Sequence, residues 1–550
     1  MNIQSSRLLA PVSVALLAIA ILIAQLLIFV VPAWGRQAHT GDELTSFLAA
    51  TGHLAEYNTV RWNETYPAGQ WVPASEWQRF LQVEEGRGLP AVANDMFYWD
   101  VHPPLYFWLL HGWLHVVPYN LWMGTLLNWM ITLLAAVVLY LLAKHLFKEP
   151  LFAYLTVAAW LLSPTLLRSA YLARHYVLTT FWTILLAYFL FRFLSSTEKK
   201  ERLLLLMGAV VASVAGILTH YLFLFVVAGA FFVAMVEIWA RIGRAARIGV
   251  GLLAAAAAIV ALAFVVSGRL GAMTYFSASL ETAAIHWDRL PKLGVTLIYL
   301  CLPILVALFL VVVGRWVGKS ETAGRAMVNS GGETASNDSN GRLLLQLLAL
   351  TLIPYVVQWI LTVIDVFASH TMTVQYVIYL SPYVALMAVA LLVRLDHRRR
   401  LVNWFIVLLV GLALATSYPR VQSLIDSDRY DLSGVAGAPY VLIDRINVPT
   451  FLMQLDEDQL VYAASQGTIL ERPNDWLPRL AAEGGHYISH LFPADVIRSR
   501  RDATLEGREQ ILEQIAAVAC YERISETRLI NGMLAIYRVQ PRGAGTCPAN

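Results

Sequence analysis

Charged residues are scarce in this sequence: Asp, Glu, Lys and Arg make up 14% of its 550 residues, whereas a soluble globular chain carries about 25%. Hydrophobic residues make up 58%, and the mean hydropathy is +0.59. This composition excludes an ordinary soluble protein and indicates a polytopic membrane protein. The formal net charge of +3 discriminates little between kinds of partner, but the positions of the charges are informative.

Cysteines and recognisable cofactor motifs are also few. Of the three cysteines, Cys301 lies in an apolar run and Cys520 and Cys547 lie near the C-terminus. An extracytoplasmic cysteine pair can form a disulfide, and the sequence leaves a Cys520–Cys547 bridge and two free thiols as equal alternatives. There is no Walker motif, nucleotide loop or dedicated metal cluster. His111 and His115 have the helical spacing of metal ligands, but no acid shares their face, which disfavours a metal there.

Long apolar runs, by contrast, are abundant. A membrane-spanning helix needs about 20 apolar residues, and such runs recur almost continuously up to residue 417. We predict eleven spans, at 8–31, 121–143, 151–167, 177–194, 203–218, 222–240, 248–266, 293–313, 343–366, 377–395 and 401–417. Residues 1–417 therefore form a transmembrane domain with a first outer loop at 34–120 and a cytoplasmic linker at 314–342, of which 329–341 is typical of a flexible segment.

The basic clusters fix the expected orientation, because cytoplasmic loops collect Lys and Arg. The clusters at 144–148, 198–202, 241–247 and 394–400 all fall on the cytoplasmic side only if 103–118 does not cross the membrane. We therefore predict that this segment is an interfacial helix, rich in Trp and begun by Pro103-Pro104. The predicted protein is a multi-pass membrane protein, with a cytoplasmic N-terminus, an uncleaved signal anchor and an extracytoplasmic region at 418–550.

With this orientation, unusual polar residues gather at the outer ends of different spans. They are Asp42, Glu43, Asp95, Asp100, His102, Arg168, Arg174, His175, Tyr176, His220, Tyr221, His286, Asp288 and His370. Transport sites usually lie at mid-depth on broken helices, so this distribution favours a cavity at the outer surface. Structural roles compete with this interpretation: Asp42 could cap a helix, Arg174 could be a snorkelling cation, and His220 could be ordinary interface composition.

Five motifs in order carry a family resemblance. They are "GDE" (41–43), "DVHPPLYFWLLHGW" (100–113), "SPTLLRSAYLARHYVL" (163–178), "LTHYLFLFV" (218–226) and "VQYVIYLSPYVAL" (374–386). Together they resemble the GT-C superfamily of polyprenyl-phosphate-sugar-dependent glycosyltransferases, in the branch of lipid A aminoarabinose transferases, core galacturonosyltransferases and protein O-mannosyltransferases. The resemblance covers roughly residues 1–400. It implies a mainly α fold of about eleven transmembrane helices, followed here by a C-terminal α/β domain.

The resemblance also implies roles for individual residues. Asp42 would be the general base that activates an acceptor hydroxyl, with Glu43 as support, and His102, Arg174 and His175 would bind the donor phosphate. The substrate pocket would include Asp95, Asp100, Tyr176, His220, Tyr221, Gln375 and Tyr376. Two positions depart from the family: Leu172-Ala173 precede Arg174 where an acid is usual, and Gln375-Tyr376 replaces an Arg-Tyr pair. A phosphate-contacting cation is therefore missing or supplied from elsewhere.

The implied reaction transfers a sugar, with inversion, from a polyprenyl-phosphate donor to a hydroxyl of a lipid, glycan or protein acceptor of the cell envelope. It requires no cofactor. Asp42, Asp95 and Asp100 are able to bind a divalent metal, but the sequence does not indicate one. Membrane lipids are expected partners and nucleic acids are not. Two alternatives stay open: a lipid or glycan transporter without covalent chemistry, and a ligase that uses a diphosphate-linked oligosaccharide.

The region 418–550 has the composition of a soluble α/β domain. "PYVLID" (439–444) predicts a strand, and helices are expected near 459–465 and 508–518. "YERISETRLI-NG-MLAIYRVQ" predicts a β-hairpin, because Asn-Gly favours the type I′ turn that joins two strands. We find no catalytic constellation in this region, and acceptor docking and a structural lid are equal alternatives for its role.

Overall fold

The computed structural model describes residues 41–100, 102–239, 296–298, 300–312, 334–363, 374–393, 437–444, 452–491, 504–529 and 532–542, with isolated positions between and after them. The chain divides into two compact units. The helical unit comprises Met1–Val31, Asp100–Tyr106 and Gly124–Val421, and the sheet unit comprises Pro32–Trp99, Phe107–Met123 and Gln422–Asn550.

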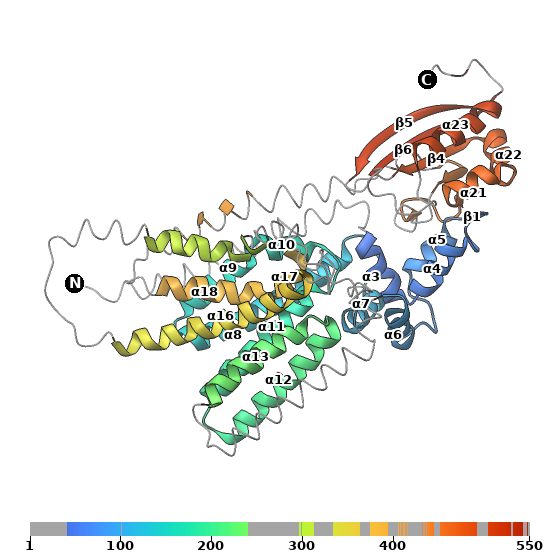
Figure 1. The fold of residues 1–550 in the computed structure, drawn as a ribbon. Coiled ribbons are helices and arrows are strands. Elements are labelled where there is room, and N and C mark those ends of the chain that lie inside the picture. Colours follow the sequence, from blue (N-terminus) through green and yellow to red (C-terminus); the bar gives the residue numbers. More distant parts are fainter. Residues whose placement is uncertain are drawn as a thin grey trace, which may run out of the picture. The chain divides into compact units, whose positions relative to one another are not determined.

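The helical unit is built from long apolar helices (Figure 1). Their bounds are α8 Met123–Phe147, α9 Pro150–Leu161, α10 Pro164–Tyr171, α11 Tyr176–Ser195, α12 Lys199–Thr219, α13 Phe223–Trp239, α16 Thr334–Val363, α17 Val374–Val377 and α18 Ser381–Val393, with a 3₁₀ turn at Ile378–Leu380. Among the described residues, five stretches are long and apolar enough to span a membrane: α8, α11, α12, Gly341–Thr362 and Gln375–Val393. Counting α9 and α10, which are bent by 50°, as one span gives six.

These spans coincide with five of the eleven predicted ones, and the total of eleven is not confirmed. The runs at 8–31 and 248–266, and most of 401–417, lie outside the described residues. Helix α13 and the segment Leu300–Val312 are apolar but shorter than 18 residues. One prediction is wrong: part of the flexible segment 329–341 is helical, because α16 begins at Thr334. Ser, Asn and Asp are typical of loops, but they also favour the first turn of a helix, so this composition was ambiguous.

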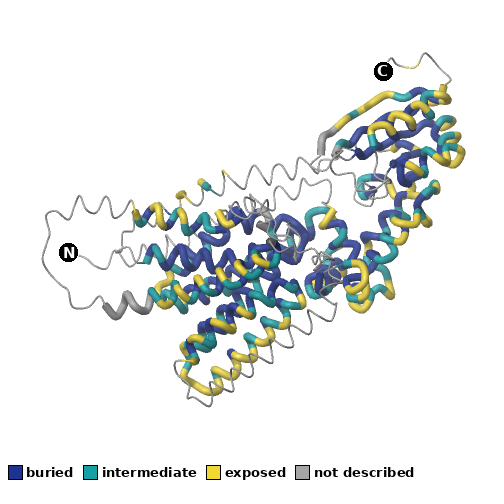
Figure 2. The backbone as a smooth tube through the Cα atoms, viewed as in Figure 1, coloured by how far each residue is buried: buried dark blue, intermediate teal, exposed yellow. Residues whose placement is uncertain are grey.

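The surfaces of the helical unit fit a lipid environment. Helix α12 carries exposed apolar side chains over most of its length, among them Leu204, Met207 and Val211 (Figure 2). On its packed side, a Cβ atom at Gly216 would come within 2.3 Å of the Phe223 ring, so only glycine fits there. Helices α13 and α16 are joined by Glu237, which pairs with Arg342 and accepts a hydrogen bond of 2.7 Å from Gln346.

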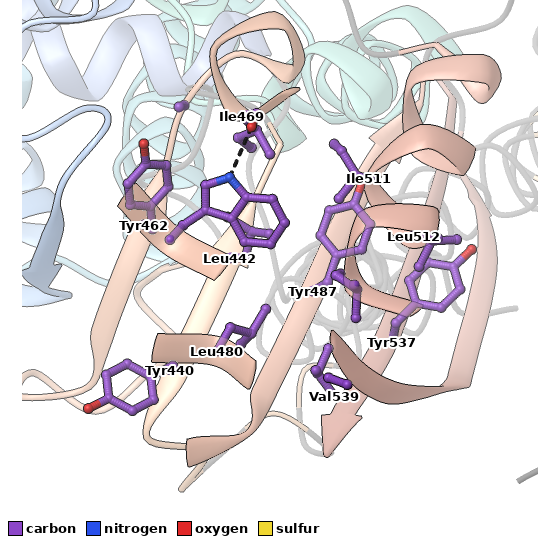
Figure 3. Packing of buried hydrophobic residues seen from close by; sticks show 14 of the residues in the cluster. Tyr440, Leu442, Tyr462, Ile469, Leu480, Tyr487, Ile511, Leu512, Tyr537 and Val539 are labelled. Carbon is purple, nitrogen blue, oxygen red and sulfur yellow. Dashed lines mark hydrogen bonds between the residues drawn. The ribbon is translucent and has the colours of Figure 1, made fainter. Parts of the chain in front are cut away.

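The sheet unit contains a six-stranded sheet in the order β1-β3-β2-β4-β6-β5. The strands are β1 Trp71–Pro73, β2 Tyr440–Ile443, β3 Leu460–Ala463, β4 Gly485–Leu491, β5 Ala519–Leu529 and β6 Gly532–Pro541. Strands β3, β2 and β4 are parallel, and the outer pairings are antiparallel. Helices α21 Gln466–Glu471, α22 Pro473–Glu483 and α23 Leu505–Val518 cover a core of Tyr, Leu and Ile side chains around Trp476 (Figure 3).

Most predictions for this region are confirmed. The strand at 439–444 is β2, the helix near 508–518 is α23, and the hairpin is β5–β6, which pairs Leu529 with Gly532. The helix expected near 459–465 is wrong, because Leu460–Ala463 form the strand β3. Val461 and Tyr462 favour strands when they are buried between neighbouring strands, as they are here between β1 and β2.

The strand β1 comes from the first outer loop and was not anticipated. It pairs antiparallel with β3, matching Val72 to Val461. Nearby, Gln78 donates hydrogen bonds to the carbonyls of Leu452 and Leu455, at 2.7 and 3.0 Å. The first outer loop and the C-terminal region therefore fold together, although more than 370 residues separate the bonded groups.

The rest of the first loop is helical: α3 Gly41–Thr51, α4 Leu54–Asn63, α5 Ser75–Gln78, a 3₁₀ turn at Arg79–Leu81, α6 Leu89–Tyr98 and α7 Leu105–Val116. Helix α7 has 12 residues and is therefore about 18 Å long, whereas the hydrocarbon core of a bilayer is about 30 Å thick. Helix α7 is therefore too short to cross the membrane, as the orientation predicted from the basic clusters requires. Its location at the membrane interface stays a prediction.

A disulfide joins Cys520 at the start of β5 to Cys547, which decides between the two alternatives left by the sequence. The bridge ties the chain's tail to an edge strand of the sheet. Cys301 is a free thiol.

The core of the sheet unit predicts a stability effect. Trp476 is fully buried and its indole N–H donates to the Ile469 carbonyl at 2.9 Å. Trp476→Ala should cost about 3–5 kcal/mol of stability and accelerate amide hydrogen exchange in β4 and β6, measured by mass spectrometry on the full chain. Trp62→Ala is the matched control, because Trp62 is 51% exposed. Equal exchange in both variants would contradict this packing.

A pH effect follows from His486 on β4. Burial, together with repulsion from Arg538 on β6, lowers the pKa of His486 to about 4. The unfolded chain, with a pKa near 6.5, therefore binds a proton that the folded chain excludes, and the stability of this sheet falls as the pH drops from about 6.5 towards 4. His486→Gln should weaken that dependence in exchange measurements at pH 7 and pH 5, and an unchanged dependence would refute the assignment.

Candidate active site

Three histidines of the helical unit come together although more than 40 residues separate each from the next in sequence. His102 follows the turn at Asp100, His175 precedes the first residue of α11, and His220 lies between α12 and α13. Each histidine occupies a place where the chain leaves or enters a helix. At such breaks a side chain is not committed to a helix face and can turn toward the other helix ends.

The three imidazoles form a compact group, here called the histidine cluster (His102, His175 and His220). Ring centroids lie 4.4 Å apart for His102 and His175, 4.6 Å for His175 and His220, and 5.8 Å for His102 and His220. One nitrogen atom from each ring lies within 4.8 Å of the others. All three side chains are buried. They therefore present several nitrogen atoms to one small volume.

Aromatic side chains surround the histidine cluster. The Tyr176 ring is tilted against His175 at 4.5 Å, and Tyr376 on α17 lies 5.3 Å from Tyr176 and 6.0 Å from His220, between ring centroids. Arg174, next to His175 in sequence, is also buried. The structure thus places five further predicted site residues near His102, namely Arg174, His175, Tyr176, His220 and Tyr376. Tyr106, which was not predicted, lies 6.5 Å from His175 between ring centroids.

The non-helical segment between α10 and α11, which carries Arg174 and His175, is held by helix α8. Asn128 donates its side-chain N–H groups to the carbonyls of Leu172 and Arg174, and its carbonyl oxygen accepts from Tyr106 Oη at 3.2 Å. Thr125, one turn earlier, donates to the Tyr171 carbonyl at 2.7 Å. Sequence reasoning missed both residues. The signal was present, since a buried amide inside an apolar span needs a specific partner.

Asp100 orients one member of the cluster. Its Oδ1 lies 2.5 Å from His102 Nδ1 and also accepts the His102 backbone N–H at 3.1 Å. A carboxylate on Nδ1 holds the proton at that nitrogen and leaves Nε2 of the neutral ring as a lone-pair donor. Asp100 is therefore placed to fix the orientation and tautomer of His102.

Burial sets the charge state of the other two imidazoles, which lie just outside the spans. Desolvation lowers the pKa of His175 well below its ordinary value, and the neighbouring His102, His220 and Arg174 lower it further. The pKa of His220 is likewise well below normal, first through burial and then through His102 and Arg174. Both rings are therefore neutral at physiological pH.

The remaining predicted site residues lie elsewhere. In the sheet unit, Asp42 and Glu43 occupy the first turn of α3, where Asp42 is exposed and Glu43 is fully buried. Asp95 on α6 is buried and accepts the Leu54 N–H at 2.8 Å, which satisfies a donor at the start of α4. In the helical unit, Tyr221 follows His220 in a turn and Gln375 lies on α17. His286, Asp288 and His370 lie outside the described residues.

The pair His111 and His115 has a structural partner in the sheet unit. His111 Nδ1 lies 2.7 Å from the Ala50 carbonyl, and its Nε2 lies 3.2 Å from His115 Nε2. His111 therefore links α7 to α3. This contact gives the pair a role that involves no ligand.

Comparison with known proteins places the histidine cluster inside a family match. Residues 101–268 match the family described as dolichyl-phosphate-mannose-protein mannosyltransferase. No curated protein matches the chain significantly. Two solved structures of ArnT from Cupriavidus metallidurans, bound to undecaprenyl phosphate and in the apo state, are similar at 12% identity over 94% of this chain and 97% of theirs, with TM-scores of 0.47 and 0.37.

The similarity to this family covers residues 101–268, and it agrees with the resemblance that the sequence motifs carry. All three members of the histidine cluster, with Arg174 and Asn128, fall within the matched segment.

Substitution of Asn128 tests whether its hydrogen bonds hold the site in place. Asn128→Ala leaves buried carbonyls of the segment between α10 and α11 without their donors, which should lower the free energy of unfolding by roughly 1–3 kcal/mol. Asn120→Ala, at an exposed position, should change it by less than about 0.5 kcal/mol. Thermal unfolding of the detergent-solubilised full chain measures both, and indistinguishable melting curves would argue against a role for Asn128.

Proposed function

We propose that this protein is an integral membrane glycosyltransferase that moves a sugar from a polyprenyl-phosphate donor to a hydroxyl of a cell-envelope acceptor on the extracytoplasmic face. The observation that carries the proposal is the buried group of Arg174 and the histidine cluster, within the segment that matches a mannosyltransferase family. The proposed location is a bacterial inner membrane, with a cytoplasmic N-terminus and an extracytoplasmic sheet unit.

The phosphate of the donor fits the chemistry of this group. Arg174 offers a permanently charged planar guanidinium, which binds phosphate oxygens through paired N–H groups. The nearby imidazoles add nitrogen atoms, and Tyr176 and Tyr376 add aromatic walls. Arg174 matches the arginine that the family has in the motif at 163–178, whereas Gln375 stands where the family has a second arginine before Tyr376. Stabilising the charge that builds on the leaving phosphate is the largest single contribution such a site can make.

Asp42 is the proposed general base. In the transfer step, the acceptor oxygen forms a bond to the anomeric carbon, its proton passes to the Asp42 carboxylate, and the bond between that carbon and the phosphate oxygen breaks. The leaving polyprenyl phosphate keeps the electron pair. Attack from the side opposite to the phosphate inverts the anomeric configuration. The exposure of Asp42 in the first turn of α3 supports this role, because an acceptor can reach it.

A base replacement tests this function. Asp42→Asn keeps the shape of the side chain and removes its proton affinity, so release of polyprenyl phosphate should fall by roughly 10²–10⁴-fold. The assay uses the reconstituted full chain with polyprenyl-phosphate mannose and polyprenyl-phosphate aminoarabinose, each with an envelope extract as acceptor. Asp458→Asn, the same change at an exposed position of the sheet unit, should retain full turnover.

The two variants separate the possible results. Wild-type turnover with full activity of Asp42→Asn would exclude Asp42 as the base but keep the transferase. No release from either donor by the wild-type protein would count against the proposed donor class.

A further inference from the structure

The histidine cluster has a feature that a phosphate site alone does not explain. His175 is completely buried, and neither of its ring nitrogens has a hydrogen-bond partner among the described residues. The same holds for Nε2 of His220. A buried polar group without a partner costs roughly 1–3 kcal/mol, and such groups in a folded protein require an explanation. Two of them meet here within one cluster.

Burial limits the kinds of ligand that the cluster can bind. It disfavours the charged form of an imidazole, so the buried rings of His175 and His220 offer nitrogen lone pairs. Neutral imidazole is the form that binds transition metals. Three such rings with one nitrogen each inside 4.8 Å match the three-histidine ligand set of metal sites that keep a fourth position open.

Asp100 supplies the remaining element of such a site. Metal-binding histidines usually donate their other ring N–H to a carboxylate or carbonyl, which fixes the tautomer and raises the basicity of the ligating nitrogen. Asp100 Oδ1, 2.5 Å from His102 Nδ1, makes this contact. The cluster therefore has three candidate ligands from three non-helical segments, and a carboxylate contacts one of these ligands, His102.

We propose that His102, His175 and His220 bind one divalent transition metal ion of the zinc type, with Asp100 as the positioning residue behind His102. Imidazole ligands suit Zn²⁺, Cu²⁺, Ni²⁺ and Fe²⁺ and disfavour Mg²⁺ and Ca²⁺, which prefer oxygen. The site itself rests on the geometry alone. A fourth ligand position would accept a phosphate oxygen of the donor, and that part rests on the proposed function.

One ligand must adjust when the metal binds. The Leu222 backbone N–H donates to His220 Nδ1 at 3.0 Å, so the proton of the neutral ring sits on Nε2. Binding through Nε2 moves this proton to Nδ1 and breaks the Leu222 contact, while binding through Nδ1 replaces that contact directly. Either way the turn between α12 and α13 changes, and no net proton is released.

Cobalt binding tests the proposal without an activity assay. Co²⁺ reports a tetrahedral nitrogen site by intense visible absorption, and Zn²⁺, which binds such sites more tightly, should bleach it. The full chain, purified with a tag free of histidine, should bind one equivalent of Co²⁺. The absence of a tetrahedral spectrum in the wild-type protein would overturn the proposal, and the cluster would then be an anion cradle of N–H donors.

Variants assign the ion to the cluster. His175→Gln and His220→Gln should abolish the spectrum, whereas His111→Gln/His115→Gln, which removes the other neighbouring histidine pair, should retain it. A spectrum that survives the first two and disappears in the third would place the metal elsewhere and overturn the assignment. Asp100→Asn should weaken affinity by roughly 10–100-fold, and unchanged affinity would remove the role of Asp100.

Two further measurements make the outcome decisive if a cluster variant does not fold. X-ray absorption of the zinc-loaded wild-type protein should count three imidazoles, and fewer would overturn the site without any substitution. Adding polyprenyl phosphate should shift the Co²⁺ spectrum, and no shift would refute the open fourth position while the metal site stands. Asp42→Asn should bind Co²⁺ like the wild type, so failure of the base assignment and failure of the metal proposal are distinguishable.

Discussion

The hydrogen bonds of one buried amide hold the structure's candidate site in place. Between α10 and α11 the chain leaves the helical pattern inside a unit of apolar helices, where free carbonyl groups find no water. Asn128 on α8 satisfies the carbonyls of Leu172 and Arg174. Non-helical backbone within a membrane protein is tolerated only where such partners exist. The orientation of Arg174 and His175 therefore depends on a residue that has no part in the chemistry.

The same constraint explains why the site is made at helix ends. A side chain in the middle of a packed span is committed to one helix face, and in α18 nearly every residue is buried by neighbouring helices. His102, His175 and His220 instead lie in three breaks, which gives each ring freedom to meet the other two. Polar contacts to Asp100 and Leu222 then limit that freedom for His102 and His220. The ring nitrogens of His175 have no hydrogen-bond partner among the described residues, and its ring contacts other aromatic rings.

Sequence patterns predicted the local elements well and the long-range assembly poorly. The apolar runs located α8, α11 and α12, and the motifs selected His102, His175 and His220 before any geometry was known. The resemblance implied that all three belong to one site, but the close contact of their rings was not predictable, because it depends on how α11, α12 and α13 pack. The pairing of β1 with β3 was hidden for the same reason: a three-residue strand has too short a pattern to recognise. Asn128 was missed because its partners are backbone groups 44 and 46 residues away.

The choice of histidine over lysine has a physical consequence in a buried cluster. A lysine in this place would either carry a poorly solvated charge next to Arg174 or lose its proton, and the neutral amine is a poor partner for phosphate. An imidazole stays neutral on burial, at little cost, and still offers both an N–H donor and a lone pair. The neutral imidazoles of His175 and His220 beside one permanent cation therefore keep the positive charge of the cluster low when no ligand is bound. A phosphate or a metal ion then supplies the charge or the bonds that the unpartnered nitrogens of His175 and His220 lack.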